Sequence, residues 1–252
     1  MCIGPDRSVQ NELSTEEWKN AIKFFADRET SSVVFTGGEP LIREDIVELL
    51  GYAKSCGLRT TLSTNALLLA EHIKEVVAYV DEVGIPIDGS TEEVNSLLRP
   101  GNGRQLEAAI SAIRLLREEK PDIEITVRTV VTQANIESLS EIGKLLTGLP
   151  RIDRWKLYEL VPTAGIVYTK DVYNWDTLKL DQDTFEETIT ALKLKFPDLN
   201  IESQTIAAQT QGYVFVWPDS KVFSLWNLNI GDFREIPPKT LEARLRQLPI
   251  HR

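Results

Sequence analysis

Residues 37–40 read Gly-Gly-Glu-Pro, a combination that could bind a positively charged group. Glycine tolerates a positive φ and lets backbone carbonyl oxygens approach a ligand, and proline fixes the direction in which the chain leaves the turn. The carboxylate of Glu39 accepts hydrogen bonds but cannot donate them. Carbonyl and carboxylate oxygens suit an ammonium group, whereas a phosphate would require N–H donors and a lysine. The alternative interpretation is a tight turn with a solvated glutamate.

Other polar side chains follow later β-rich segments. Ser63 and Asn65 come at the end of one such segment, and Asp88 comes at the end of the next. Hydroxyl, amide and carboxylate groups can bind a ribose diol or a free carboxylate, but the same residue types are preferred in helix caps and turns. Arg99, in the glycine-rich stretch 98–103, could pair with a carboxylate. The alternative for Arg99 is an ordinary surface arginine.

These residues lie at the ends of β-rich segments that alternate with segments of helical periodicity. Such alternation predicts a parallel sheet with right-handed crossovers, in which the carboxyl ends of all strands share the ligand-binding edge. The sequence predicts strands at 31–35, 58–63, 83–87, 123–131 and 155–161, and helices at 16–28, 43–55, 70–79, 104–119, 136–146 and 183–196.

We divide the chain into an α/β core at 1–200 and a C-terminal extension at 201–252. The extension is predicted to contain a hairpin around Pro218-Asp219 and a short helix near 240–248. Aromatic residues alternate along the hairpin, as they would in a hairpin that covers an open sheet edge. A second possibility is that the aromatic side chains line a substrate pocket; they are Tyr213, Phe215, Trp217 and Trp226.

Composition restricts the class of protein. The chain has 252 residues, a formal net charge of −10 and a pI near 4.9, which argues against non-specific binding to nucleic acid. No apolar run approaches the roughly 18 residues of a membrane span. The two cysteines, Cys2 and Cys56, provide no disulfide framework. We therefore expect a cytoplasmic protein that binds neither membranes nor nucleic acid, with Cys56 as a packed small residue.

Four segments, taken in order, resemble successive landmarks of the radical S-adenosylmethionine (radical SAM) enzymes. They are FTGGEPLIRED, TTLSTNALLL, VGIPIDGSTEEVNSLLRPGNG and TVVTQAN, and the resemblance runs from Cys2 to about Gly165. It implies an incomplete (β/α)6-type partial TIM barrel whose first strand is missing from this sequence. It also implies a [4Fe–4S] cluster that reductively cleaves S-adenosylmethionine to a 5′-deoxyadenosyl radical. That radical abstracts hydrogen from a small-molecule or peptide substrate, and a flavodoxin- or ferredoxin-type donor supplies the electron.

The resemblance assigns roles by position, with no catalytic side chain identified. Many members have a serine where Pro86 stands, so Ser63 or Arg99 would have to bind the methionine carboxylate here. The implied ligands of S-adenosylmethionine are Gly37, Gly38, Glu39 and Pro40 at the ammonium group, Ser63 and Asn65 at the carboxylate or ribose, Asp88 at the ribose, and Thr132, Asn135 and Val161 near the adenine.

Cys2 takes the place of the third cysteine in the CxxxCxxC loop that holds the cluster in this family. We expect the first two cysteines and the first strand to lie upstream, so that this chain is a shortened form that cannot hold a cluster well. The lack of cysteines after Cys56 indicates a single-cluster type. Three alternatives stay open: a free cysteine at position 2, a cluster-free barrel that binds S-adenosylmethionine or a nucleotide, and an unrelated βα-barrel lyase with Glu39 or Asp88 as general base.

Overall fold

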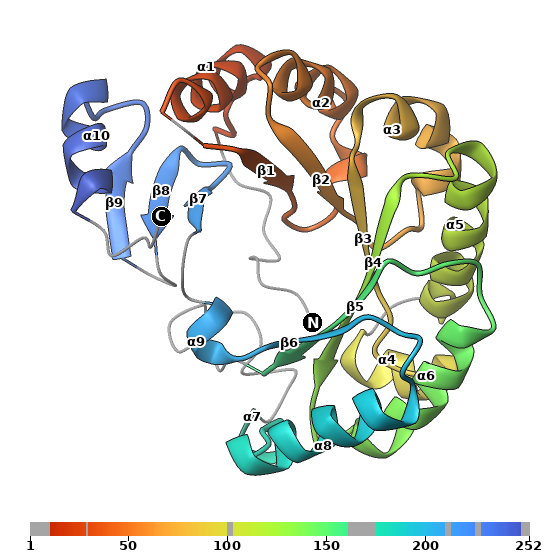
Figure 1. The fold of residues 1–252 in the computed structure, drawn as a ribbon. Coiled ribbons are helices and arrows are strands. Elements are labelled where there is room, and N and C mark those ends of the chain that lie inside the picture. The colour runs from red at the N-terminus through yellow and green to blue at the C-terminus, as the bar shows by residue number, and fades with distance from the viewer. Residues whose placement is uncertain are drawn as a thin grey trace.

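A curved sheet of six parallel strands forms the centre of the molecule. The computed structural model describes residues 11–28, 30–99, 103–160, 175–209, 213–224 and 228–247. Helices cover the outer face of the sheet (Figure 1), and no pairing among the described strands joins the first to the last, so the barrel is open. This confirms the expected partial barrel. In spatial order the strands are β1 (Ser32–Phe35), β2 (Arg59–Ser63), β3 (Glu82–Pro86), β4 (Glu124–Val131), β5 (Arg154–Glu159) and β6 (Ile201–Gln204).

The helices follow the apolar periodicity of the sequence, and local capping sets several of their ends. Ser14 and Glu17 form a capping box at the start of the first helix, and Gly57 follows the second with a φ of +80°. The helices are α1 (Thr15–Ala26), α2 (Ile46–Ser55), α3 (Ile73–Tyr79), α4 (Glu92–Leu98), α5 (Gln105–Glu119), α6 (Leu139–Thr147), α7 (Trp175–Leu178), α8 (Gln182–Lys195), α9 (Ile206–Gln209) and α10 (Pro238–Arg246), with 3-10 turns η1 (Pro40–Ile42), η2 (Leu69–His72) and η3 (Ile136–Ser138).

No helix within the described ranges combines the length and the apolar character needed to cross a bilayer.

The main hydrophobic core lies between the sheet and its helices. Alternate residues of the inner strands point into it, because successive side chains of a strand face opposite sides of the sheet. These core residues are all buried, and they meet the apolar faces of α2, α3, α5, α6 and α8. On the strands they are Leu62, Val83, Ile85, Ile125, Val127, Trp155 and Leu157.

Several elements differ from the sequence-based expectation, and among them the four-residue helices α7 and α9 were not predicted. Helix α4 was not predicted, because its seven residues are mostly polar and follow a turn-like sequence. Strand β6 was not predicted either, and its pairing with β5 carries the barrel sheet past residue 200, where we had placed a boundary. The C-terminal hairpin is present as β7 (Val214–Val216) and β8 (Lys221–Ser224), and a third antiparallel strand, β9 (Leu228–Asp232), extends it.

This small C-terminal sheet lies on the open side of the barrel, between β1 and β6 (Figure 1). Val214, Val216 and Val222 face a second hydrophobic cluster that Phe24 of α1 shares. The ring of Phe24 meets that of Phe233 edge to face, with ring centroids 5.7 Å apart. The sheet is therefore anchored on α1 rather than paired with a barrel strand.

Replacing Phe24 with alanine is expected to weaken this anchoring. Phe→Ala changes in packed cores lower the free energy of unfolding by about 3–5 kcal/mol, because they remove apolar contacts and leave a cavity. Urea unfolding followed by circular dichroism measures the effect. The control is Leu194→Ala, whose parent residue is 81% exposed on α8 and should change stability by less than about 0.5 kcal/mol. Equal stabilities of the two variants would show that the C-terminal sheet is not held through Phe24.

Candidate functional site

Glu39 joins the turn that follows β1 to the turn that follows β2. One carboxylate oxygen accepts hydrogen bonds from the Thr64 hydroxyl (2.7 Å) and the Leu41 amide (3.1 Å), and the other accepts from the Asn65 amide (2.6 Å). These bonds use both oxygens of the side chain. Glu39 therefore positions two neighbouring turns, which the sequence did not reveal.

The two glycines before Glu39 leave the backbone of this turn open. Gly37 has a φ of +141°, which favours glycine, and an added Cβ at Gly37 or Gly38 would meet nothing within 4 Å. Both residues are exposed, whereas Pro40 is buried and begins η1. A ligand can thus approach backbone carbonyls that the braced Glu39 holds in place. An ammonium group stays the ligand that the residue types predict for this turn.

Ser63 and Asn65 face different surroundings. The Ser63 hydroxyl accepts a hydrogen bond from Nη1 of Arg128 (2.9 Å), a residue of β4. The Asn65 side-chain oxygen accepts from the Leu67 amide (2.9 Å) within its own turn. Ser63 therefore belongs to the inner face of the barrel, and the oxygen of Asn65 stabilises the local turn.

Asp88 is fully buried at the end of β3 and is bound on several sides. One carboxylate oxygen accepts from the Val130 amide (2.7 Å), and the other pairs with Nε of Arg99 at 2.6 Å. The Asp88 amide donates to the side-chain oxygen of Asn95, a buried residue of α4 (2.9 Å). Arg99 thus pairs with a carboxylate, as the sequence suggested, but that carboxylate belongs to the protein.

Asn135 uses all four of its hydrogen-bonding positions within the chain. Its amide group donates to the backbone oxygens of Asp88 and Val130 (both 2.9 Å), and its oxygen accepts from the backbone and hydroxyl of Thr132 (2.8 and 3.1 Å). Both Thr132 and Asn135 are buried. In this state the pair braces the ends of β3 and β4, so neither side chain presents an open group for adenine.

The parallel sheet places the expected site residues along one edge, as predicted. Glu39 bridges β1 and β2, while Asp88 and Asn135 bridge β3 and β4. Cys2 and Val161 lie outside the described residues.

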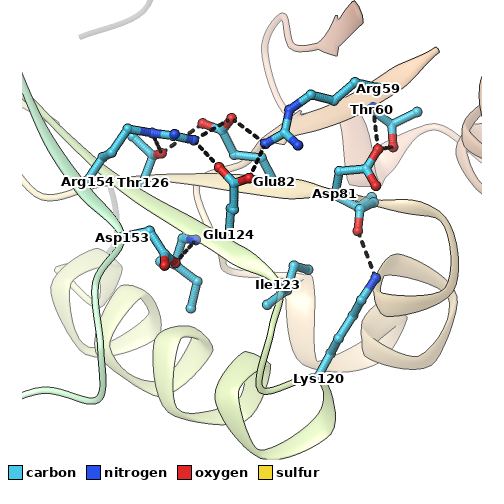
Figure 2. A network of polar contacts seen from close by, with 12 residues as sticks. Arg59, Thr60, Asp81, Glu82, Lys120, Ile123, Glu124, Thr126, Asp153 and Arg154 are labelled. Carbon is cyan, nitrogen blue, oxygen red and sulfur yellow. Dashed lines mark hydrogen bonds and ion pairs between the residues drawn. The ribbon is translucent and has the colours of Figure 1, made fainter.

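The inner face of the barrel carries a group of charged side chains that sequence reasoning missed (Figure 2). Glu82 accepts from the Thr126 hydroxyl (2.8 Å) and pairs with Arg154 (2.9 Å) and Arg59 (3.5 Å). Glu124 pairs with the same two arginines. The signal was present in the sequence, because these charged residues alternate with apolar ones along β-rich segments. We refer to Arg59, Glu82, Glu124 and Arg154 as the inner-face quartet.

The charges of this face shift the pKa of Glu82. Burial acts to raise it, but the Thr126 hydrogen bond and the positive charges of Arg154 and Arg128 outweigh burial and hold the pKa below the usual 4.5. A carboxyl group whose pKa is lower in the folded state stabilises the fold above its unfolded pKa and loses that contribution as pH falls through the folded pKa.

Glu82→Gln should therefore destabilise the protein in a pH-dependent way. At pH 7 we expect the free energy of unfolding to fall by about 3 kcal/mol, because two arginines lose a buried partner. The difference from the parent should shrink as pH falls below 4.5 and through the lower pKa of the folded state, at which Glu82 itself becomes protonated. Urea unfolding of the variant and the parent, at pH 7 and at a pH below 4.5, measures this difference in stability.

Glu202→Gln is the matched control, since Glu202 is 37% exposed and lies 3.6 Å from Lys156. Its effect should stay below about 1 kcal/mol at either pH. A difference between Glu82→Gln and the parent that does not change with pH would contradict the assigned pKa direction.

Comparison with known proteins places these features in a family. The family model of the radical SAM superfamily matches residues 1–146. The AdoMet-dependent heme synthase of Nitratidesulfovibrio vulgaris is 35% identical over 155 residues, which cover 61% of this chain and 41% of that protein. The Fe-coproporphyrin III synthase of Methanosarcina barkeri is 35% identical over 161 residues (62% and 38%), and the PqqA peptide cyclase of Bradyrhizobium diazoefficiens is 35% identical over 149 residues (56% and 37%). The chain spans about two fifths of the length of these relatives.

Solved structures share the fold at low sequence identity. SuiB of Streptococcus suis, bound to S-adenosylmethionine, aligns with a TM-score of 0.71 and 16% identity, covering 96% of this chain and 63% of that one. Coproporphyrinogen III oxidase (HemN) of Escherichia coli aligns with a TM-score of 0.52 and 13% identity, covering 71% and 44%. The first of these alignments extends beyond the barrel into the C-terminal sheet.

Proposed function

Because this chain belongs to the radical SAM superfamily, we propose that it binds S-adenosylmethionine at the edge formed by the turns after β1–β4 and serves hydrogen abstraction from a substrate. Members of the superfamily use a [4Fe–4S] cluster together with S-adenosylmethionine. When bound, the two supply a one-electron reductive cleavage that generates the abstracting radical. The observation that carries the proposal is the open Gly37-Gly38 turn, whose two residues are exposed and whose neighbour Glu39 is held by three hydrogen bonds.

The residues of this chain then have distinct tasks. The carbonyls of Gly37 and Gly38 accept the ammonium protons, and the negative charge of Glu39 adds to the attraction while its hydrogen bonds hold the turn. Asp88 and Asn135 act in the folded chain by bracing the edge rather than by offering open groups. Arg99 and Ser63 are the candidates for the methionine carboxylate, and Cys2 is the candidate iron ligand.

The substrate and the electron donor are further parts of the proposal. The names of the relatives point to tetrapyrroles in two cases and to a peptide in the third, so they favour no single class. We take a small molecule or a peptide as substrate, a flavodoxin- or ferredoxin-type protein as reductant, and the cytoplasm as the location. The cluster-free alternative predicts binding of S-adenosylmethionine without bound iron, and iron content distinguishes the two.

Glu39→Gln tests the ammonium site. The change keeps the shape of the side chain but removes the negative charge that attracts the ammonium group and weakens the hydrogen bonds that hold the turn. Loss of a charged acceptor costs about 1.5–3 kcal/mol, so affinity should fall roughly ten- to a hundredfold. Calorimetry with S-adenosylmethionine measures the loss, on anaerobically reconstituted protein in a form that also carries the first two cysteines of the CxxxCxxC loop. Glu44→Gln, at an exposed position five residues away, should bind as the parent does.

Iron content, determined on the same samples, separates the two parts of the site. Glu39→Gln should retain the iron of the parent, whereas Cys2→Ser should reduce it. Unchanged affinity in Glu39→Gln would refute the ammonium assignment, and unchanged iron in Cys2→Ser would refute the role of Cys2.

A further inference from the structure

Arg128 lies on the inner face of the barrel, where its side chain crosses from β4 over β3 towards β2. Its Nη1 donates to the Ser63 hydroxyl at 2.9 Å. The crossing is possible because residue 84 is glycine: a Cβ built on Gly84 would lie 2.4 Å from Cζ of Arg128. The guanidinium group therefore lies directly against the backbone of β3, in space that any larger residue at position 84 would occupy.

The charge of Arg128 is only weakly compensated. Its nearest carboxylate partner is Glu82, at 3.9 Å, and Glu82 is already engaged by Arg154 and Arg59. The Nε of Arg128 is buried and has no hydrogen-bond partner in the described part of the chain. The Nε itself is shielded from solvent, so a ligand would meet the part of the Arg128 side chain that is exposed, which is 23% of it.

Lys156 adds a second basic group directly opposite Arg128 on the neighbouring strand. It is the register partner of Arg128 on β5, and its Nζ lies 3.6 Å from Glu202. The inner face of β2–β6 thus carries a surplus of positive charge in a chain whose net charge is −10. The basic residues are Arg59, Arg128, Arg154 and Lys156, and the acidic ones are Glu82, Glu124 and Glu202.

We propose that Arg128, with Lys156 beside it, binds a carboxylate group of the substrate inside the barrel; this rests on the proposed function. A guanidinium group offers paired donors that match the geometry of a carboxylate. The neighbouring inner-face quartet is already neutralised by its own members. Because Lys156 is paired with Glu202, the surplus is the single positive charge of Arg128, and it selects a negatively charged substrate.

The position agrees with the proposed chemistry. Ser63, which holds Arg128, directly precedes Thr64 and Asn65, whose bonds to Glu39 brace the turn that holds the cofactor. A carboxylate at Arg128 would thus place the substrate next to that turn. Tyr158, further along the same face, is half-buried, and burial raises the pKa of its phenol, so the group stays a neutral hydrogen-bond donor near the site.

Nitrogen NMR of the arginine side chains in the full chain tests the proposal. The Nε–H signals of Arg128 and Arg154 are assigned by their loss in Arg128→Lys and Arg154→Lys, and the parent protein is titrated with propionate and with propionamide. Propionate should shift the Arg128 signal and saturate in a roughly millimolar range, as suits a ligand of few atoms. Propionamide should not shift it. The Arg154 signal is the internal control and should not move, because its Nε already donates to Thr126.

A parallel titration in saturating S-adenosylhomocysteine separates substrate from cofactor, since the cofactor also carries a carboxylate. The proposal expects the propionate response of Arg128 to persist. It is overturned if propionate has no effect, if propionamide acts equally, or if S-adenosylhomocysteine itself shifts the Arg128 signal and abolishes the response. If calorimetry shows no binding of S-adenosylhomocysteine while the propionate response is intact, the proposed function fails but the carboxylate site is supported.

Discussion

The inner face of this open parallel barrel has to compensate its own charges, because the helices that pack on the sheet in the described part of the chain cover its outer face. In this chain Glu82 and Glu124 lie between Arg59 and Arg154, and each of the four is the first residue of one of four adjacent strands. Their mutual pairing ties β2, β3, β4 and β5 together from the inside, while apolar packing does so from the outside. The spacing of these four strands depends on both.

The carboxyl edge is rigid for a related reason: its polar side chains mostly bind one another. Glu39 connects the first two turns, and Asn135 connects Asp88 to the end of β4. Such side chains are easily read as ligands from sequence alone, because capping, turn formation and ligand binding use the same chemical groups. The open part of the edge is the backbone of Gly37 and Gly38. The hydrogen bonds of the neighbouring Glu39 hold this exposed backbone in position.

Local patterns in the sequence were enough to predict the elements that build the barrel and the edge on which the site residues meet. Apolar alternation marked β1–β5, and helical spacing marked most of the helices. Strand β6 was not predicted because Ile201–Gln204 contains only one large apolar residue, and among the described strands it pairs only with β5. The partner of Arg128 could not be predicted, since it depends on Gly84 and Ser63 in two other strands. Hydrogen-bond partners across strands are set by register, which local periodicity does not contain.

The contact between Gly84 and Arg128 couples two positions that are 44 residues apart in the sequence but adjacent in the sheet. A larger residue at position 84 would push the guanidinium out of its place, and a shorter residue at position 128 would leave the glycine backbone uncovered. Among homologous sequences the two positions should consequently vary together. In some lineages both residues could be replaced by uncharged residues larger than glycine and smaller than arginine. The same part of the inner face would then carry no charge. A change at this pair of positions would therefore accompany a change of substrate.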